Sequence, residues 1–192
     1  MFRRKILSHA LRRLFVQLSL PTLRNNYYRF RHRWGYYGKG VRIGKGVDFY
    51  GDLKRVFLYD NSEIMDYSKV FIVGPNASIT LRENSSIGYF NIVNVHAQFV
   101  LGENSMTGPF VSFNDSDHAI TKKESIRFSG YSEGVIQVDK DVWIGTGARV
   151  LKNVAIGEGA VIGANAVVTK NIPPWSVAVG IPAKVIRMRT DS

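Results

Sequence analysis

The sequence predicts an all-β solenoid, and three features of its last third carry that prediction. An aliphatic residue recurs at every sixth position, and a small or β-branched residue follows four places after each. Glycine often comes directly after the aliphatic position, as at Gly145, Gly157 and Gly163. A period of six fits neither a 3.6-residue helix nor a simple alternating strand, but it fits short strands that stack on their neighbours. The aliphatic register is Val138, Ile144, Val150, Ile156, Ile162 and Val168.

The repeat continues toward the N-terminus in a less regular phase. Clear units surround Ile43, Ile87 and Leu101, so we expect residues 39–180 to form one solenoid of short strands. Asparagine recurs near the expected turns, where it tolerates a left-handed backbone conformation. These residues are Asn61, Asn76, Asn84 and Asn104.

The period breaks twice in the second half of the chain. Residues 114–136 form a long polar and aromatic run, which predicts a loop extruded from the solenoid. Long loops in compact folds usually carry function. The period fails again after residue 172, and residues 181–192 are expected to form a basic C-terminal cap.

Composition predicts a single domain with an appendage. The chain has 192 residues and a formal charge of +11, but nine basic groups and no acidic group lie within residues 1–35. The basicity therefore belongs to one segment and does not indicate a nucleic-acid-binding protein. The absence of cysteine excludes disulfides, a cysteine nucleophile and thiolate metal sites.

Residues 1–38 are expected to form a basic amphipathic helical arm followed by an aromatic connector. The arm is too short and too charged to span a bilayer, and Pro21 is expected to end its helix. Two interpretations stay open. Residues 1–34 could lie on an anionic membrane, or the helix could pack against the solenoid or a neighbouring subunit. The apolar stripe of the arm is Ile6, Leu7, Ala10, Leu11, Leu14, Phe15 and Leu18.

Among four histidines, His118 is the candidate catalytic group. It lies at the edge of the extruded loop in a polar setting, where a neutral imidazole can take a proton from a hydroxyl or amine. The alternative is a histidine that only bonds to loop backbone. His96 is the second histidine of the repeat region, and two histidines without cysteine cannot build a three-histidine metal site, so no metal is predicted. No phosphate-binding glycine loop of the GxxxxGK type is present.

Five stretches closely resemble the hexapeptide-repeat acetyltransferases, nearest to the galactoside, maltose and bacterial-polysaccharide O-acetyltransferases. They are residues 142–147, 156–157, 161–164, 167–174 and 180–186. The resemblance implies a left-handed parallel β-helix, an exception to the right-handed crossover rule. It also implies a homotrimer with active sites in the grooves between subunits. The co-substrate would be acetyl-CoA, bound along one coil edge, without a metal.

Carried over to this chain, the resemblance makes His118 the base that deprotonates an acceptor hydroxyl during attack on the thioester. A backbone carbonyl, Asp115 or Asp117 would hold the other ring nitrogen. A backbone N–H would stabilise the oxyanion, and coenzyme A would leave as a thiolate. Acceptor-binding residues are expected at Asn91 or Asn94, together with the two aspartates.

The resemblance also assigns the donor groove. The residues that match positions lining the pantetheine and adenine are Trp143, Thr146, Ala164, Thr169 and Lys170. Lys184 and Arg187 match a basic pair near the nucleotide phosphates. Ala119 stands where the sugar acetyltransferases often have proline, and residues 119–134 find no match, so the acceptor contacts in this loop are open.

The function implied is an acetyl-CoA-dependent O-acetyltransferase acting on a sugar of a surface polysaccharide or its lipid-linked precursor. The expected location is cytoplasmic, with peripheral contact at the inner face of the membrane through the arm. Two alternatives stay open: N-acetylation of a nucleotide-linked amino sugar, and a catalytically silent β-helix scaffold.

Overall fold

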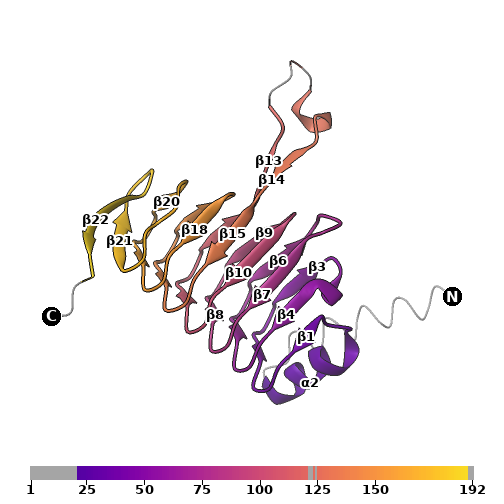
Figure 1. Cartoon of the computed structure of the whole chain (residues 1–192). Coiled ribbons are helices and arrows are strands. Elements are labelled where there is room, and N and C mark those ends of the chain that lie inside the picture. The colour runs from indigo at the N-terminus through magenta and orange to yellow at the C-terminus, as the bar shows by residue number, and fades with distance from the viewer. Residues whose placement is uncertain (1–20, 121–122, 124, 190–192) are drawn as a thin grey trace.

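The computed structural model describes residues 21–120, 123 and 125–189, and these form a parallel β-helix with three faces. Figure 1 shows the coils stacked from the N-terminal to the C-terminal end, with a hairpin projecting from one side. Each complete turn of the solenoid contributes one strand to each of three sheets, which we call A, B and C in the order in which the chain visits them, and sheet B continues beyond the last complete turn. We call the turns between successive sheets the A–B, B–C and C–A corners.

The bounds of the strands follow the coil order. Sheet A holds β1 (Tyr36–Tyr37), β4 (Val56–Leu58), β7 (Ser78–Leu81), β10 (Gln98–Leu101), β15 (Val135–Val138) and β18 (Val154–Ile156). Sheet B holds β2 (Arg42–Ile43), β5 (Glu63–Ile64), β8 (Ser86–Ile87), β11 (Met106–Thr107), β16 (Trp143–Ile144), β19 (Val161–Ile162), β21 (Ser176–Val179) and β22 (Lys184–Met188). Sheet C holds β3 (Asp48–Tyr50), β6 (Lys69–Ile72), β9 (Ile92–Val95), β12 (Ser112–Asn114), β17 (Arg149–Leu151) and β20 (Val167–Val168). Two short 3-10 helices are η1 (Leu53–Arg55) and η2 (Ile126–Phe128).

The aliphatic register predicted from the sequence forms the core. All six of its members are at most 1% exposed. Val138 pairs with Ile156 and Ile144 with Ile162 in parallel ladders, so three hexapeptides complete one coil. Burying each aliphatic side chain contributes about 1.5–3 kcal/mol, and the core is therefore a column that every coil extends.

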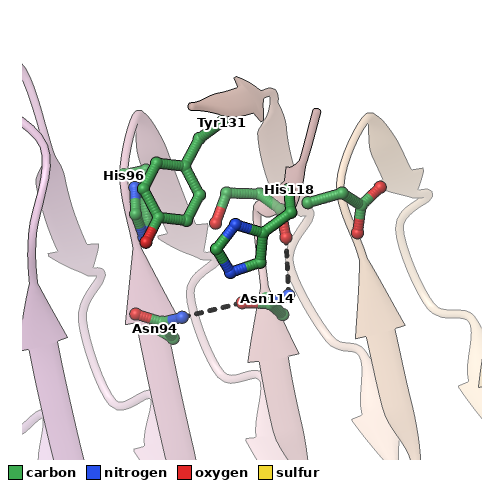
Figure 2. A pocket seen from close by; sticks show the side chains of 7 residues that line it. Asn94, His96, Asn114, His118 and Tyr131 are labelled. Atoms are coloured by element: carbon green, nitrogen blue, oxygen red, sulfur yellow. Dashed lines mark hydrogen bonds between the residues drawn. The ribbon is translucent and has the colours of Figure 1, made fainter. Parts of the chain in front are cut away.

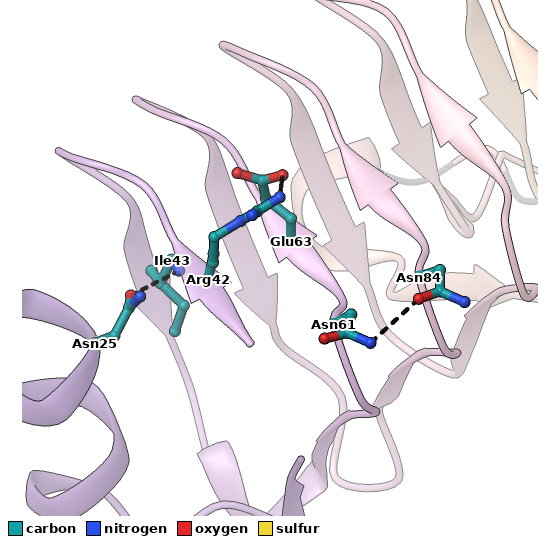
Figure 3. Close-up of polar contacts among 6 residues, drawn as sticks. All are labelled: Asn25, Arg42, Ile43, Asn61, Glu63 and Asn84. Carbon is teal, nitrogen blue, oxygen red and sulfur yellow. Dashed lines mark hydrogen bonds and ion pairs between the residues drawn. The ribbon is translucent and has the colours of Figure 1, made fainter. Parts of the chain in front are cut away.

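The corners need residues with a left-handed backbone. At the A–B corner, Asn61, Asn84 and Asn104 have φ of 58°, 55° and 57°, which confirms the predicted left-handed conformation for these three. The fourth expected residue, Asn76, lies in a turn but without a positive φ. The side chains of Asn61, Asn84 and Asn104 also bond to each other along the solenoid. Asn61 Nδ2 donates to Asn84 Oδ1 at 3.3 Å (Figure 3), and Asn84 Nδ2 donates to Asn104 Oδ1 at 3.2 Å. We call this the asparagine ladder.

Helix α2 (Pro21–Arg31) covers the N-terminal end of the solenoid. Arg24 Nε donates to the carbonyl oxygen of Ile43 at 2.7 Å, and the Tyr28 hydroxyl donates to that of Val47 at 2.7 Å. Figure 3 shows Asn25 accepting the backbone N–H of Ile43. Tyr28 is 3% exposed, so α2 belongs to the core.

One expectation about the N-terminal segment changes. Pro21 is the first residue of α2, a position where its missing N–H and its restricted φ suit a helix, and the helix that it was expected to end lies outside the described residues. Residues 27–31 of the expected connector are therefore helical. Within residues 21–31 the structure supports packing against the solenoid, whereas the predicted apolar stripe before Pro21 lies outside the described residues. No helix among the described residues is long and apolar enough to cross a membrane.

The extruded loop is an antiparallel hairpin. It leaves the solenoid after β12 and returns at β15, and its strands are β13 (Ser116–His118) and β14 (Tyr131–Glu133). His118 pairs with Tyr131 across the hairpin. The N–H of Gly134 donates to the carbonyl oxygen of Asp115 at 2.7 Å and closes its base at the C–A corner.

Candidate active site

A polar pocket of about 350 Å³ lies where the hairpin meets the outer face of sheet C. Figure 2 shows the side chains of this pocket above β9 and β12, with Tyr131 and His118 coming from the hairpin. The lining residues are Asn94, His96, Asn114, Ser116, Asp117, His118 and Tyr131. Two predicted site residues, Asn94 and Asp117, thus share one pocket with His118.

The ring of Tyr131 lies between two imidazoles. Its centroid is 4.6 Å from that of His118, with an interplanar angle of 35°, and 4.7 Å from that of His96, with an angle of 45°. His96 is 6% exposed, whereas His118 is exposed. Of the two histidines, His118 is therefore the one that solvent and a ligand can reach.

Two amides form the side of the pocket next to sheet C. Asn94 and Asn114 are register partners on β9 and β12, and Asn94 Nδ2 donates to Asn114 Oδ1 at 2.8 Å. Asn114 Nδ2 in turn donates to the carbonyl oxygen of Ser116 at 2.7 Å. These bonds hold the amides in place, and a fixed pair of amides beside an imidazole suits a ligand that carries hydroxyl groups.

Asp115 was expected to bind the acceptor or to hold the His118 ring, but its side chain lies in the interior. Its carboxylate is fully buried and accepts the backbone N–H of His96 at 2.7 Å and that of Ala97 at 2.8 Å. Burial raises the pKa of the Asp115 carboxyl, against the opposing effect of the backbone N–H groups. Asp115 therefore ties the hairpin base to the turn at His96, and it neither holds the His118 ring nor reaches an acceptor.

Asp117 lines the pocket but is paired with a lysine. Its carboxylate is 3.0 Å from Lys152 Nζ, and Lys152 also donates to Ser132 Oγ at 2.8 Å. Within the described part of the chain, the carboxylates of Asp115 and Asp117 thus bind other partners than the His118 imidazole. The expectation that one of them orients this ring is not met.

Asn91 does not reach the pocket. Its side chain is fully buried inside the B–C corner, where Nδ2 donates to Thr107 Oγ1 and to the carbonyl oxygen of Gly108, both at 3.1 Å. Of the two asparagines expected to bind an acceptor, only Asn94 faces the pocket, because it lies on the outer face of β9 whereas Asn91 lies inside a turn.

The predicted donor residues fall into separate groups on one chain. Trp143 is 51% exposed on β16 of sheet B. Thr146 lies at the B–C corner of the same coil, and Ala164 lies at the equivalent position of the next coil. Thr169 and Lys170 directly follow β20, at the C–A edge of sheet C. The pocket around His118 does not include Trp143.

Lys184 and Arg187 lie at the C-terminal end of the solenoid. Both belong to β22, which pairs antiparallel with β21 and continues sheet B. They are exposed, and so they are available to a phosphate at the end of the sheet that carries Trp143.

An exposed column of aromatic rings separates the Trp143 face from the His118 face. At the B–C corner, Tyr67 and Phe90 stack at 5.4 Å and 9°, and Phe90 and Phe110 at 5.1 Å and 8°. Their exposed fractions are 40%, 45% and 60%, and their φ angles are 61°, 56° and 59°. We call this column the aromatic ladder.

Sequence reasoning missed the aromatic ladder and Tyr131. The three ladder residues occupy the corner position that Gly46 and Gly147 hold in other coils, both with positive φ, so aligning the coils is the signal that reveals them. Tyr131 carries no comparable signal, because its position opposite His118 depends on how the hairpin pairs.

The comparisons with known proteins agree with this architecture. Residues 136–170 match the family model described as bacterial transferase hexapeptide (six repeats). A Schizosaccharomyces pombe protein that is classed provisionally as an acetyltransferase is 39% identical over 142 residues, which cover 70% of this chain and 65% of that protein. The chain spans between half and two thirds of the length of the first curated relatives it matches.

Two solved structures show the same fold. A variant of the N-acyltransferase AntD from Bacillus cereus, in complex with dTDP-4-amino-4,6-dideoxyglucose and coenzyme A, has a TM-score of 0.73 and 19% identity over 86% of this chain and 89% of its own. A maltose O-acetyltransferase from Clostridium difficile 630 has a TM-score of 0.63 and 24% identity over 95% of this chain and 84% of its own. The predicted left-handed parallel β-helix and the resemblance to hexapeptide-repeat acetyltransferases are thus confirmed.

Proposed function

We propose that this protein transfers acetyl from acetyl-CoA to a hydroxyl of a sugar, with His118 as the general base. The observation that carries the proposal is the accessible His118 imidazole at a polar pocket fixed by Asn94 and Asn114. The pocket lies where the hexapeptide period breaks, on a hairpin held by the solenoid. The acetyltransferase class of the matched relatives and the sugar acceptors in the names of the structural neighbours support the same chemistry.

The reaction needs one proton to move twice. His118 takes the proton of the acceptor hydroxyl while that oxygen attacks the thioester carbon. The tetrahedral intermediate then collapses with cleavage of the carbon–sulfur bond. The imidazolium returns its proton to the coenzyme A thiolate or to solvent, so the enzyme ends unchanged and forms no covalent intermediate.

We infer that the active unit is a homotrimer whose subunits meet along the aromatic ladder. His118 lies on the sheet C side of this edge and Trp143 on the sheet B side. Three parallel copies joined at the edge would bring the C face of one against the B face of the next. The rings of the aromatic ladder are spaced by the distance between coils. A second copy of this chain carries the same rings at the same spacing and therefore matches the ladder. Exposed aromatic rings are also typical of interface cores.

This arrangement would complete the donor groove from two chains. Trp143, Thr146 and Ala164 would line the pantetheine from one subunit, while Thr169 and Lys170 would approach from the C–A edge of the next, the edge that carries its hairpin. Lys184 and Arg187 would meet the phosphates of acetyl-CoA by charge.

The finer proposal for the acceptor is a sugar of a surface polysaccharide or of its lipid-linked precursor, modified in the cytoplasm beside the membrane. Nine cations without an acid in residues 1–35 favour contact with an anionic membrane. In the described part of this segment, Phe30 is 80% and Leu23 48% exposed on α2, beside exposed Arg29 and Arg31. Both apolar and cationic groups are thus presented at that end.

The membrane contact is tested by removing residues 1–20 alone, because α2 packs on the solenoid and has to stay. We expect binding to anionic vesicles to fall strongly and binding to neutral vesicles to stay low. Unchanged binding to the anionic vesicles would show that the membrane role is wrong.

The enzymatic proposal is tested by the release of coenzyme A from acetyl-CoA in the presence of free, lipid-linked and nucleotide-linked sugars. His118→Ala should lower turnover by roughly 10²–10⁴-fold, because it removes the base. Asn104→Gly, on the distant A–B corner, is the matched control and should leave turnover unchanged. Product with an amino sugar only would select N-acetylation, a reaction that the likeness to AntD keeps open. No acceptor-dependent release from any sugar would favour a scaffold.

A further inference from the structure

His118 needs a group that orients its ring, and the expected carboxylates do not supply it. A histidine that acts as a base is usually held by a third group, which fixes its rotamer. Asp115 binds the backbone N–H groups of His96 and Ala97, and Asp117 pairs with Lys152. In the described ranges, the contact that the structure gives to the His118 ring is the ring of Tyr131.

The ring of Tyr131 is itself held from two sides. The hairpin places Tyr131 directly opposite His118 in an antiparallel pair. On its other side lies the buried His96, whose backbone N–H is held by Asp115. The backbone of His96 is packed so closely on Gly74 that a Cβ there would collide with the His96 carbonyl oxygen. His96 is therefore a fixed support for Tyr131.

We propose that Tyr131 is the positioning residue of His118, with an aromatic ring in the place of a carboxylate. This inference rests on the proposed role of His118 as base. The Tyr131 ring limits the rotamers of the imidazole to those that face the pocket. It also lies over the imidazole when the acceptor proton arrives, and the π face of a tyrosine attracts a cation. The same contact thus orients the base before and during the proton transfer.

The proposal separates the ring of Tyr131 from its hydroxyl. Tyr131→Phe keeps the ring and should keep most of the turnover. Tyr131→Leu removes the aromatic face and should lower kcat by about 10²-fold, since a small misplacement of a catalytic group has this effect. The KM for acetyl-CoA should stay the same in both variants. Phe128→Leu is the control, because Phe128 is 82% exposed in the same hairpin and does not line the pocket.

A spectroscopic readout tests the contact without turnover. The ring protons of His118 should show a ring-current shift by NMR in the wild type and in Tyr131→Phe, and this shift should disappear in Tyr131→Leu. His96→Leu leaves the hairpin sequence intact but removes the support, and it should reduce both the ring-current shift and kcat. This second variant keeps the proposal testable if Tyr131→Leu does not fold.

Several results would overturn the proposal. Wild-type kcat in Tyr131→Leu would show that the ring does not position the base. An equal loss in Tyr131→Phe and Tyr131→Leu would assign the effect to the hydroxyl. If the ring-current shift of His118 persists in Tyr131→Leu, the ring of Tyr131 is not its source, and the proposed contact between the two rings does not exist. If His118→Ala keeps full turnover, the proposed function fails instead, whereas the NMR shifts still decide whether the contact exists.

Discussion

The A–B corner and the B–C corner have the same backbone conformation but carry different kinds of side chain, polar at the first and aromatic at the second. Each coil places a residue with positive φ at both corners. At the A–B corner the middle coils use Asn61, Asn84 and Asn104, whose side chains bond to each other. At the B–C corner the middle coils use the aromatic ladder, whose rings stack and stay exposed. The turn thus dictates the backbone conformation but not the side chain.

The difference teaches that the two corners meet different surroundings. Asparagine tolerates the left-handed region, whereas that region costs a bulky side chain about 1–2 kcal/mol per residue. Ring stacking recovers roughly 0.5–1.5 kcal/mol per pair, so the aromatic ladder stabilises a lone chain little. Exposed aromatics that contribute so little to the monomer are consistent with the proposed contact between subunits.

The largest expected effect comes from converting one corner into the other. Replacing Tyr67, Phe90 and Phe110 by asparagine should turn the proposed trimer into a folded monomer, because it removes the proposed contact while preserving the turns. Turnover should fall with it, since each active site would lose the Trp143 face of its neighbour. Ultracentrifugation and circular dichroism measure the assembly and the fold. If the triple variant is still a trimer, the subunits do not meet along the aromatic ladder.

A smaller effect is expected from breaking the asparagine ladder. Asn84→Ala removes two side-chain hydrogen bonds and forces alanine to adopt a φ of 55°. Together these should destabilise the fold by about 1–3 kcal/mol, as measured by urea denaturation. Asn84→Gly is the matched control, because glycine accepts this φ freely, and its loss should be smaller. Equal losses in the two variants would show that backbone conformation does not limit this corner.

The smallest effect is expected from a single exchange in the aromatic ladder. Phe90→Asn, made in a chain that already carries Tyr67→Asn and Phe110→Asn, should change the free energy of unfolding by about 1 kcal/mol or less, since both stacking partners of Phe90 are already removed and only the strain of its positive φ is relieved. Urea denaturation of the double and triple variants gives this difference. A large loss of stability would mean that the Phe90 ring stabilises the monomer through contacts other than stacking.

The hexapeptide period by itself determined the solenoid and its core. Val138 and Ile144 are buried because a periodic inward position is a local property that every coil repeats. The break at residues 114–136 likewise predicted where the chain leaves the solenoid. The edge of that loop and the resemblance both indicated His118, and the resemblance offered Asn91 or Asn94, of which the structure brings Asn94 to the pocket of His118.

Only the tertiary structure decided how side chains meet between coils and across the hairpin. Whether Asp115 faces the pocket or the interior depends on the turn at His96, which lies on another coil. Tyr131 reaches His118 through the register of an antiparallel pair, and the aromatic ladder forms because three coils align one corner position. Such contacts join residues 13 to 23 positions apart, across a hairpin or between unequal coils, and a local repeat does not specify that register.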